Sequence, residues 1–121
     1  MHVFFGELFA QQIINFPIAD QLKIRQFEKH VKQFGLTNLK GRNKSSDNVP
    51  TEDPNWRDKV AYAQKYQLWH YHIGIPDYSL ANNGDLVSEY LLHYVLGDGF
   101  IKIVDLSPHP PFVLPNIDYL K

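Results

Sequence analysis

The spacing of apolar residues changes from helical to alternating along this chain, and the change limits the folds open to it. Between Pro17 and Phe34, apolar side chains recur at helical intervals, which predicts an amphipathic helix, and Gly35 is a typical stop after it. From Lys65 onward, apolar residues alternate with polar ones, as they do in strands with one buried face. Helices followed by strands indicate an α+β domain.

The segments before and after this helix are less regular. Residues 4–15 also have helical spacing, although Gly6 weakens it, and residues 3–5 could instead form a short strand. Residues 39–58 are polar, contain two prolines and are predicted to be mostly loop. A loop this long in a small domain is usually functional or disordered.

Three strands are expected in the second half of the chain, over residues 65–75, 88–96 and 100–106. Gly97-Asp98-Gly99 between the last two is a hairpin signal. The proline-rich tail from Ser107 cannot continue a central strand. We therefore predict an antiparallel meander with the helices on one face.

Composition favours one domain, residues 1–121, because 44% apolar residues are enough for a single core. The absence of cysteine excludes disulfides, thiolate metal sites and a cysteine nucleophile. No apolar run approaches the roughly 18 residues of a membrane span, and residues 1–7 lack the basic stretch of a signal peptide. We expect a soluble, cytoplasmic protein with no membrane partner.

The net charge of −1 predicts weak non-specific binding to nucleic acid. The basic residues, however, gather in the first half of the chain and allow a local positive surface there.

Four of the six histidines lie in or beside the expected strands: His70, His72, His93 and His109. Imidazole can gain or lose a proton near neutral pH, so such a sheet is equipped for proton transfer. Alternation puts His70 and His72 on one face of their strand. The other, apolar face is expected to pack on the helices, leaving the histidine face outward. The pair could also be ordinary surface histidines, or two ligands of a metal site that needs one or two more.

His93 has apolar neighbours and could be a structural core histidine. Its partner across the hairpin depends on the turn. If residues 97–98 form the turn, His93 faces Lys102; if residues 98–99 do, it faces Val104.

Four further candidates lie outside the expected strands. His109 lies between two prolines, which restrict its backbone conformation. A histidine held in this way suits the role of a general acid or base, although it could also be a plain solvated histidine. Arg42 and Lys44 could bind phosphate or be solvated charges. Trp56 is one of several aromatics that could stack on bases or belong to the core. Together these groups match metal-free RNA cleavage, which needs a base, a cation and an acid.

The order of these features resembles the YafO-type toxins of bacterial toxin–antitoxin pairs, within the RelE/ParE-like superfamily. The resemblance extends along nearly the whole chain. It is carried, in order, by Val3-Phe4, residues 22–27, Gly41-Arg42, Trp56, His70-x-His72-Ile73, Glu89 before an apolar strand, and residues 101–106 running into Pro108-His109.

The resemblance implies a RelE-like α+β fold, with two N-terminal helices packed on a curved antiparallel β-sheet. It implies a ribosome-dependent endoribonuclease, or mRNA interferase, that needs no metal or other cofactor and leaves a 2′,3′-cyclic phosphate. Its implied partners are a cognate antitoxin and mRNA on the ribosome.

On this resemblance, Arg42, His70, His72 and His109 are carried over as matching positions. We expect His109 or His70 to act as base or acid. The full set of catalytic candidates is His70, His72, His93, Asp105 and His109. The RNA- or phosphate-binding candidates are Arg42, Lys44, Trp56 and Lys102. Two alternatives remain: a non-enzymatic, ParE-like toxin of the same fold, and an α+β protein that binds a small ligand or a metal.

Overall fold

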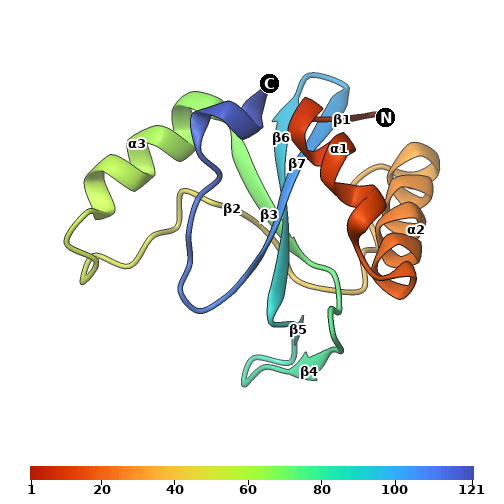
Figure 1. The fold of residues 1–121 in the computed structure, drawn as a ribbon. Coiled ribbons are helices and arrows are strands. Elements are labelled where there is room, and N and C mark those ends of the chain that lie inside the picture. Colours follow the sequence, from red (N-terminus) through yellow and green to blue (C-terminus); the bar gives the residue numbers. More distant parts are fainter.

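Helices and strands alternate more often along the chain than the sequence predicted. The computed structural model describes residues 1–121 (Figure 1). Its elements are β1 (His2–Phe5), α1 (Glu7–Gln12), the 3₁₀ helix η1 (Ile13–Asn15), α2 (Ile18–Phe34), β2 (Asn43–Ser45), α3 (Trp56–Tyr66), β3 (Leu68–His72), β4 (Ser79–Leu80), β5 (Leu86–Val87), β6 (Tyr90–Gly97), β7 (Phe100–Pro108) and the 3₁₀ helix η2 (Ile117–Leu120). None of the helices is both long enough and apolar enough to cross a membrane.

The α+β class is confirmed, but the main sheet is mixed and not antiparallel throughout. Its five strands lie in the order β1-β7-β6-β3-β2. The expected strands β3, β6 and β7 form the antiparallel meander, and β2 joins it antiparallel to β3. The first strand, β1, pairs parallel to β7 at the other edge. Both interpretations of the N-terminus are therefore partly right, since β1 precedes the short α1.

The two faces of the sheet are both covered, which corrects the prediction of helices on one face. Figure 1 shows α1 and α2 on one side and α3 with η2 on the other. The larger core cluster joins α1 and α2 to the sheet through side chains such as Phe9, Phe27 and Tyr94. A smaller cluster joins Ala63 of α3 to Val104 and to η2. The histidine side of the sheet is thus an interior layer over much of its length.

The long helix α2 is formed as predicted. Its buried residues Ile24, Phe27 and Val31 follow helical spacing and make one apolar stripe against the sheet. Gly35 ends the helix with a positive φ of 70°, a conformation that glycine adopts without a steric penalty.

The helix α3 was not predicted, and it shortens the loop and the strand on either side. It begins at Trp56, inside the predicted loop of residues 39–58, and continues to Tyr66, inside the predicted strand. Gln67 then takes a left-handed conformation that ends the helix, so β3 starts at Leu68. Only Ala63 of this helix is fully buried, and its apolar periodicity is correspondingly weak.

The β6–β7 hairpin turns at Asp98-Gly99, because Gly97 pairs with Phe100. That turn predicted Val104 as the partner of His93. A β-bulge next to His93 shifts the register by one residue, and His93 pairs with Asp105 instead. Both predicted partners, Lys102 and Val104, are therefore wrong.

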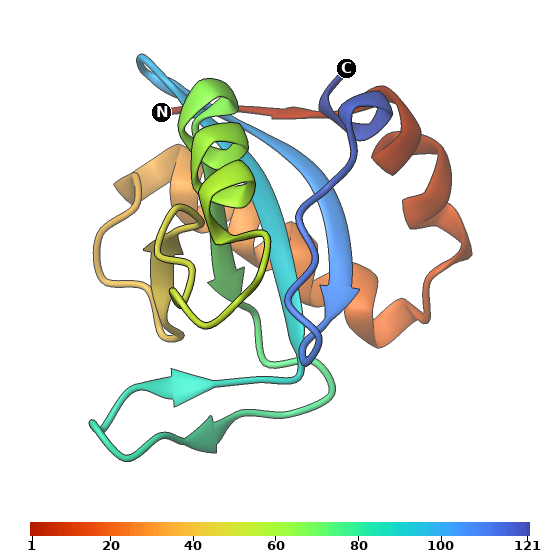
Figure 2. The same ribbon diagram turned by 90° about the vertical axis from the view of Figure 1, so that its left-hand side faces the viewer.

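A small hairpin of β4 and β5 projects away from the rest of the molecule (Figure 2). It forms a separate two-stranded sheet. The amide of Arg42 donates to the carbonyl of Leu86, which ties the start of β2 to this hairpin.

Candidate functional site

Five of the nine predicted site residues line one cavity of about 510 Å³ on the α3 side of the sheet. They are Arg42, Lys44, His70, His72 and His109. We call this space the histidine cavity. Its lining comes from four separate parts of the chain: the β2 region, β3, the β4–β5 hairpin with the start of β6, and the tail after β7. The fold therefore gathers groups that are far apart in sequence.

A row of polar side chains crosses four strands of the sheet on this side. Lys44 of β2 pairs with His70 of β3, His70 pairs with His93 of β6, and His93 pairs with Asp105 of β7. Residues directly opposite each other on neighbouring strands point to the same face. The row begins in the cavity, at Lys44 and His70, and ends beneath it.

His70 occupies the centre of β3 and is largely buried. Its Nδ1 lies 2.9 Å from the Oγ of Ser46, which fixes the ring. Burial, together with positive charge at His72 and His109, lowers the pKa of His70 to about 4. The imidazole is therefore neutral at neutral pH and able to accept a proton.

His72 ends the same strand and is buried at 6% exposure. The amide of Ser88 donates to its Nδ1 over 2.9 Å, which leaves the proton of the neutral ring on Nε2. Burial lowers the pKa of His72, and the positive charge of Arg42 also lowers it. The Ser88 carbonyl, 3.0 Å from Nδ1, acts in the opposite direction and raises the pKa.

The proline-rich tail supplies His109 and covers the histidines, which corrects the expectation that their face looks outward. The amide of His109 donates to the carbonyl of Glu89 over 2.7 Å. The ring of Phe112 lies 5.1 Å from that of His70 and 6.0 Å from that of His109, centroid to centroid. Phe112 thus closes the cavity on one side and keeps water from His70.

His93 and Asp105 lie beneath the cavity and do not line it. His93 is fully buried, with its Nε2 2.8 Å from the Oγ of Ser107 and its Nδ1 without a hydrogen-bond partner. Burial, with a smaller contribution from His70, lowers its pKa to about 3. Burial raises the pKa of Asp105, whose carboxylate accepts the amide of Leu106. In this position His93 is the core histidine that its apolar neighbours suggested.

The β4–β5 hairpin holds Arg42. Its Nε donates to Asp85 over 2.8 Å, and one Nη donates to Asn83 over 3.0 Å. These contacts fix the guanidinium in the cavity wall while leaving the other terminal nitrogen without a protein acceptor. Arginine in such a position can bind a phosphate oxygen.

Lys102 and Trp56 lie elsewhere, so the cavity does not include these two predicted phosphate and RNA contacts. The ammonium of Lys102 donates to the carbonyl of Leu120, which ties β7 to η2. Trp56 starts α3 and contacts the guanidinium of Arg57, 5.4 Å from the ring centroid.

Sequence reasoning missed Ser46, Asp85, Ser88 and Phe112. The serines and the aspartate act through local contacts that no spacing predicts. Phe112 follows two consecutive prolines and is the first large apolar residue of the tail, and this is the one signal that could have singled it out.

No three His, Asp or Glu side chains are arranged to hold a metal ion. Comparison with known proteins found no family model, no curated protein and no solved structure that matches the chain significantly.

Proposed function

We propose that this protein is a small toxin that cleaves mRNA by acid–base chemistry without a metal ion. The observation that carries the proposal is the gathering of two cations and three histidines in the histidine cavity. The YafO-type resemblance of the sequence supports the same activity, with the ribosome presenting the mRNA and a cognate antitoxin blocking the toxin. A nearly neutral protein holds free RNA weakly, so presentation by a larger partner suits its charge.

The reaction is a transfer within the RNA chain. A base removes the proton of a 2′-hydroxyl, and the 2′-oxygen attacks the neighbouring phosphorus. The bond from phosphorus to the 5′-oxygen breaks, and an acid protonates that oxygen. The products are a 2′,3′-cyclic phosphate and a 5′-hydroxyl, so no water or metal is consumed.

We assign the base to His70, because its lowered pKa keeps the ring unprotonated before RNA binds. The negative charge of a bound phosphate would raise that pKa toward neutrality, which makes the ring a more effective base in the complex. His109 reaches the cavity from a different segment and is assigned the acid. Arg42 and Lys44 are assigned to the phosphate, where they would balance the charge that develops during attack.

The test is to induce wild-type protein and two single variants in bacteria and to map new 5′ ends on cellular mRNA. We expect cuts within translated frames with wild type, and at least about a hundredfold fewer with His70→Gln or His109→Ala. His109 is exposed, so its replacement leaves the fold intact. His2→Ala, another exposed histidine outside the cavity, is the matched control.

Cuts that persist in both variants would overturn the assignment of the site. Growth arrest without cuts, unchanged by either substitution, would favour the non-enzymatic toxin. Cleaved ends that lack a cyclic phosphate would refute the proposed chemistry while leaving the nuclease activity in place.

A further inference from the structure

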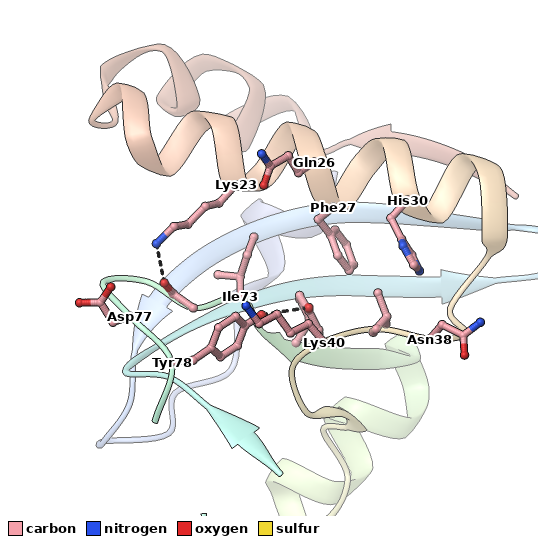
Figure 3. A pocket seen from close by; sticks show the side chains of 12 residues that line it. Lys23, Gln26, Phe27, His30, Asn38, Lys40, Ile73, Asp77 and Tyr78 are labelled. Carbon is pink, nitrogen blue, oxygen red and sulfur yellow. Dashed lines mark hydrogen bonds between the residues drawn. The ribbon is translucent and has the colours of Figure 1, made fainter. Parts of the chain in front are cut away.

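A second cavity lies on the opposite face of the sheet, between α2 and the chain that follows it. Its volume is about 560 Å³, within the range of about 300–1,000 Å³ that small-molecule sites occupy. Figure 3 shows Phe27 and His30 of α2 facing Lys40 and Tyr78 across this space. We call it the helix cavity. The proposed cleavage reaction uses none of its residues.

One wall of the helix cavity is aromatic and rigid. The rings of Phe27 and Tyr71 stack with centroids 4.7 Å apart, and both are at most 5% exposed. The hydroxyl of Tyr78 lies 3.0 Å from that of Tyr71 and is hydrogen bonded to it. Gly74 leaves room for the Tyr78 ring, since a Cβ there would lie 2.5 Å from it. Of the three rings only Tyr78 is partly exposed, so a ligand would meet the Tyr78 ring on a rigid aromatic support.

The rim of the helix cavity is polar and more basic than acidic. Lys23 already donates to the carbonyl of Gly74 over 2.6 Å (Figure 3) and to that of Pro76 over 2.8 Å. Lys40 is exposed, forms no ion pair and holds its ammonium 5.1 Å from the centroid of the Tyr78 ring. Its charge is thus available to an anion beside an aromatic face.

The amides of Gln26 and Asn38 complete the rim and offer both donors and acceptors. Asp77, the one carboxylate there, can accept hydrogen bonds from an amino group. Figure 3 shows Asp77 and Asn38 on opposite sides of the cavity. Such a rim suits a ligand with a polar edge as well as a negative charge.

We propose that the helix cavity binds one nucleotide unit, with the base against the aromatic wall and the phosphate at Lys40. Bases of any sequence stack on aromatic side chains, and an ammonium binds phosphate as a point charge. The amide groups of the rim would bond the polar edge of the base. A simple carboxylate or phosphate ion would leave the aromatic wall unused.

The two cavities are joined by a short piece of chain. Lys40 and Arg42 are two residues apart, at most about 7 Å along the backbone. Between them the amide of Gly41 donates to the Tyr71 hydroxyl over 3.1 Å. The nucleotide could therefore belong to an RNA strand that continues from the histidine cavity, or be a free mononucleotide. Only the RNA source rests on the proposed nuclease function; the site itself does not.

The test measures binding to the full-length protein by calorimetry, with adenosine 5′-monophosphate, adenosine, inorganic phosphate and a 2′-O-methyl RNA hexamer as probes. The methyl groups block the 2′-oxygens, so the hexamer cannot be cleaved. We expect saturable binding of the monophosphate, at least about tenfold tighter than adenosine or phosphate alone. Lys40→Gln and Tyr78→Leu should each weaken it about fivefold or more. Lys29→Gln, at an exposed lysine of α2 that does not line the helix cavity, is the control and should change nothing.

The arms of the experiment separate the two sources. If the hexamer binds more tightly than the monophosphate, and Lys40→Gln weakens its binding, RNA is the ligand. Binding of the monophosphate alone identifies a free nucleotide. Absence of saturable binding of both, or binding that neither Lys40→Gln nor Tyr78→Leu weakens, would overturn the proposal. This experiment measures binding and not cleavage, so the two proposals can fail separately. If the protein binds the nucleotide but cuts no mRNA, only the proposed function is refuted.

Discussion

Buried neutral histidines make the stability of this protein depend steeply on pH, and His93 offers the clearest test. In the unfolded chain a histidine takes up a proton as the pH falls below 6.5, whereas folded His93 does so only near 3. Unfolding between these values is therefore coupled to proton uptake, and the free energy of unfolding falls as the pH falls.

The size of the effect follows from the pKa difference. For one histidine that stays neutral in the folded protein, the free energy of unfolding falls by about 2 kcal/mol between about pH 7 and pH 5. His70, with its pKa near 4, adds a similar loss. Asp105 works in the opposite direction, because burial raises its pKa. A comparison of variants isolates the part that belongs to His93.

The variant is His93→Gln, which removes the titrating ring and keeps a polar side chain near Ser107. The free energy of unfolding is measured by urea denaturation at both pH values. Its decrease on acidification should be smaller in the variant than in wild type by about 2 kcal/mol. The absolute stability of the variant does not enter this comparison. His2→Gln, at an exposed position, controls for the loss of one histidine. An identical pH dependence in His93→Gln and wild type would refute the reasoning.

Three further perturbations test the packing of the main core and of the two cavities. Gly41→Ala should lower the free energy of unfolding by about 2 kcal/mol or more, because its Cβ would lie 2.0 Å from the carbonyl oxygen of His72; urea denaturation would measure this, and an unchanged midpoint would contradict it. Leu92→Ala removes a fully buried side chain of the main core and should cost about 2–5 kcal/mol in the same assay; a smaller loss would show that the core closes over the gap. Phe112→Ala should raise the pKa of His70 from about 4 toward 6.5 by admitting water, as followed by NMR titration; no rise would mean that other groups keep the ring dry.

The parts of the fold that sequence predicted well are those in which one periodicity dominates. The helix α2 has a full apolar stripe, and the β6–β7 hairpin has glycines at its turn. By contrast, α3 buries only Ala63 completely, and its polar surface gave no helical pattern. The parallel pairing of β1 with β7 leaves no local mark, because it depends on residues nearly a whole chain apart.

The candidate site was predictable in its residue types and less so in its geometry. Alternation placed His70 and His72 on the same face, as found, but could not show that the tail would cover them. The bulge that pairs His93 with Asp105 depends on one extra residue in β7, which no spacing reveals. Lys102 looked available in sequence, yet the fold engages it at the carbonyl of Leu120.

The pairing of β1 with β7 also bears on how the chain reaches its fold. Val3 lies opposite Ile101, so the edge of the sheet cannot form until the last strand is available. Closing so large a loop carries an entropic cost that local helix formation does not. During synthesis β1 therefore has no pairing strand until almost the entire polypeptide has been made, whereas α2 can form early. A nascent chain would thus hold a helical segment well before it has a complete sheet.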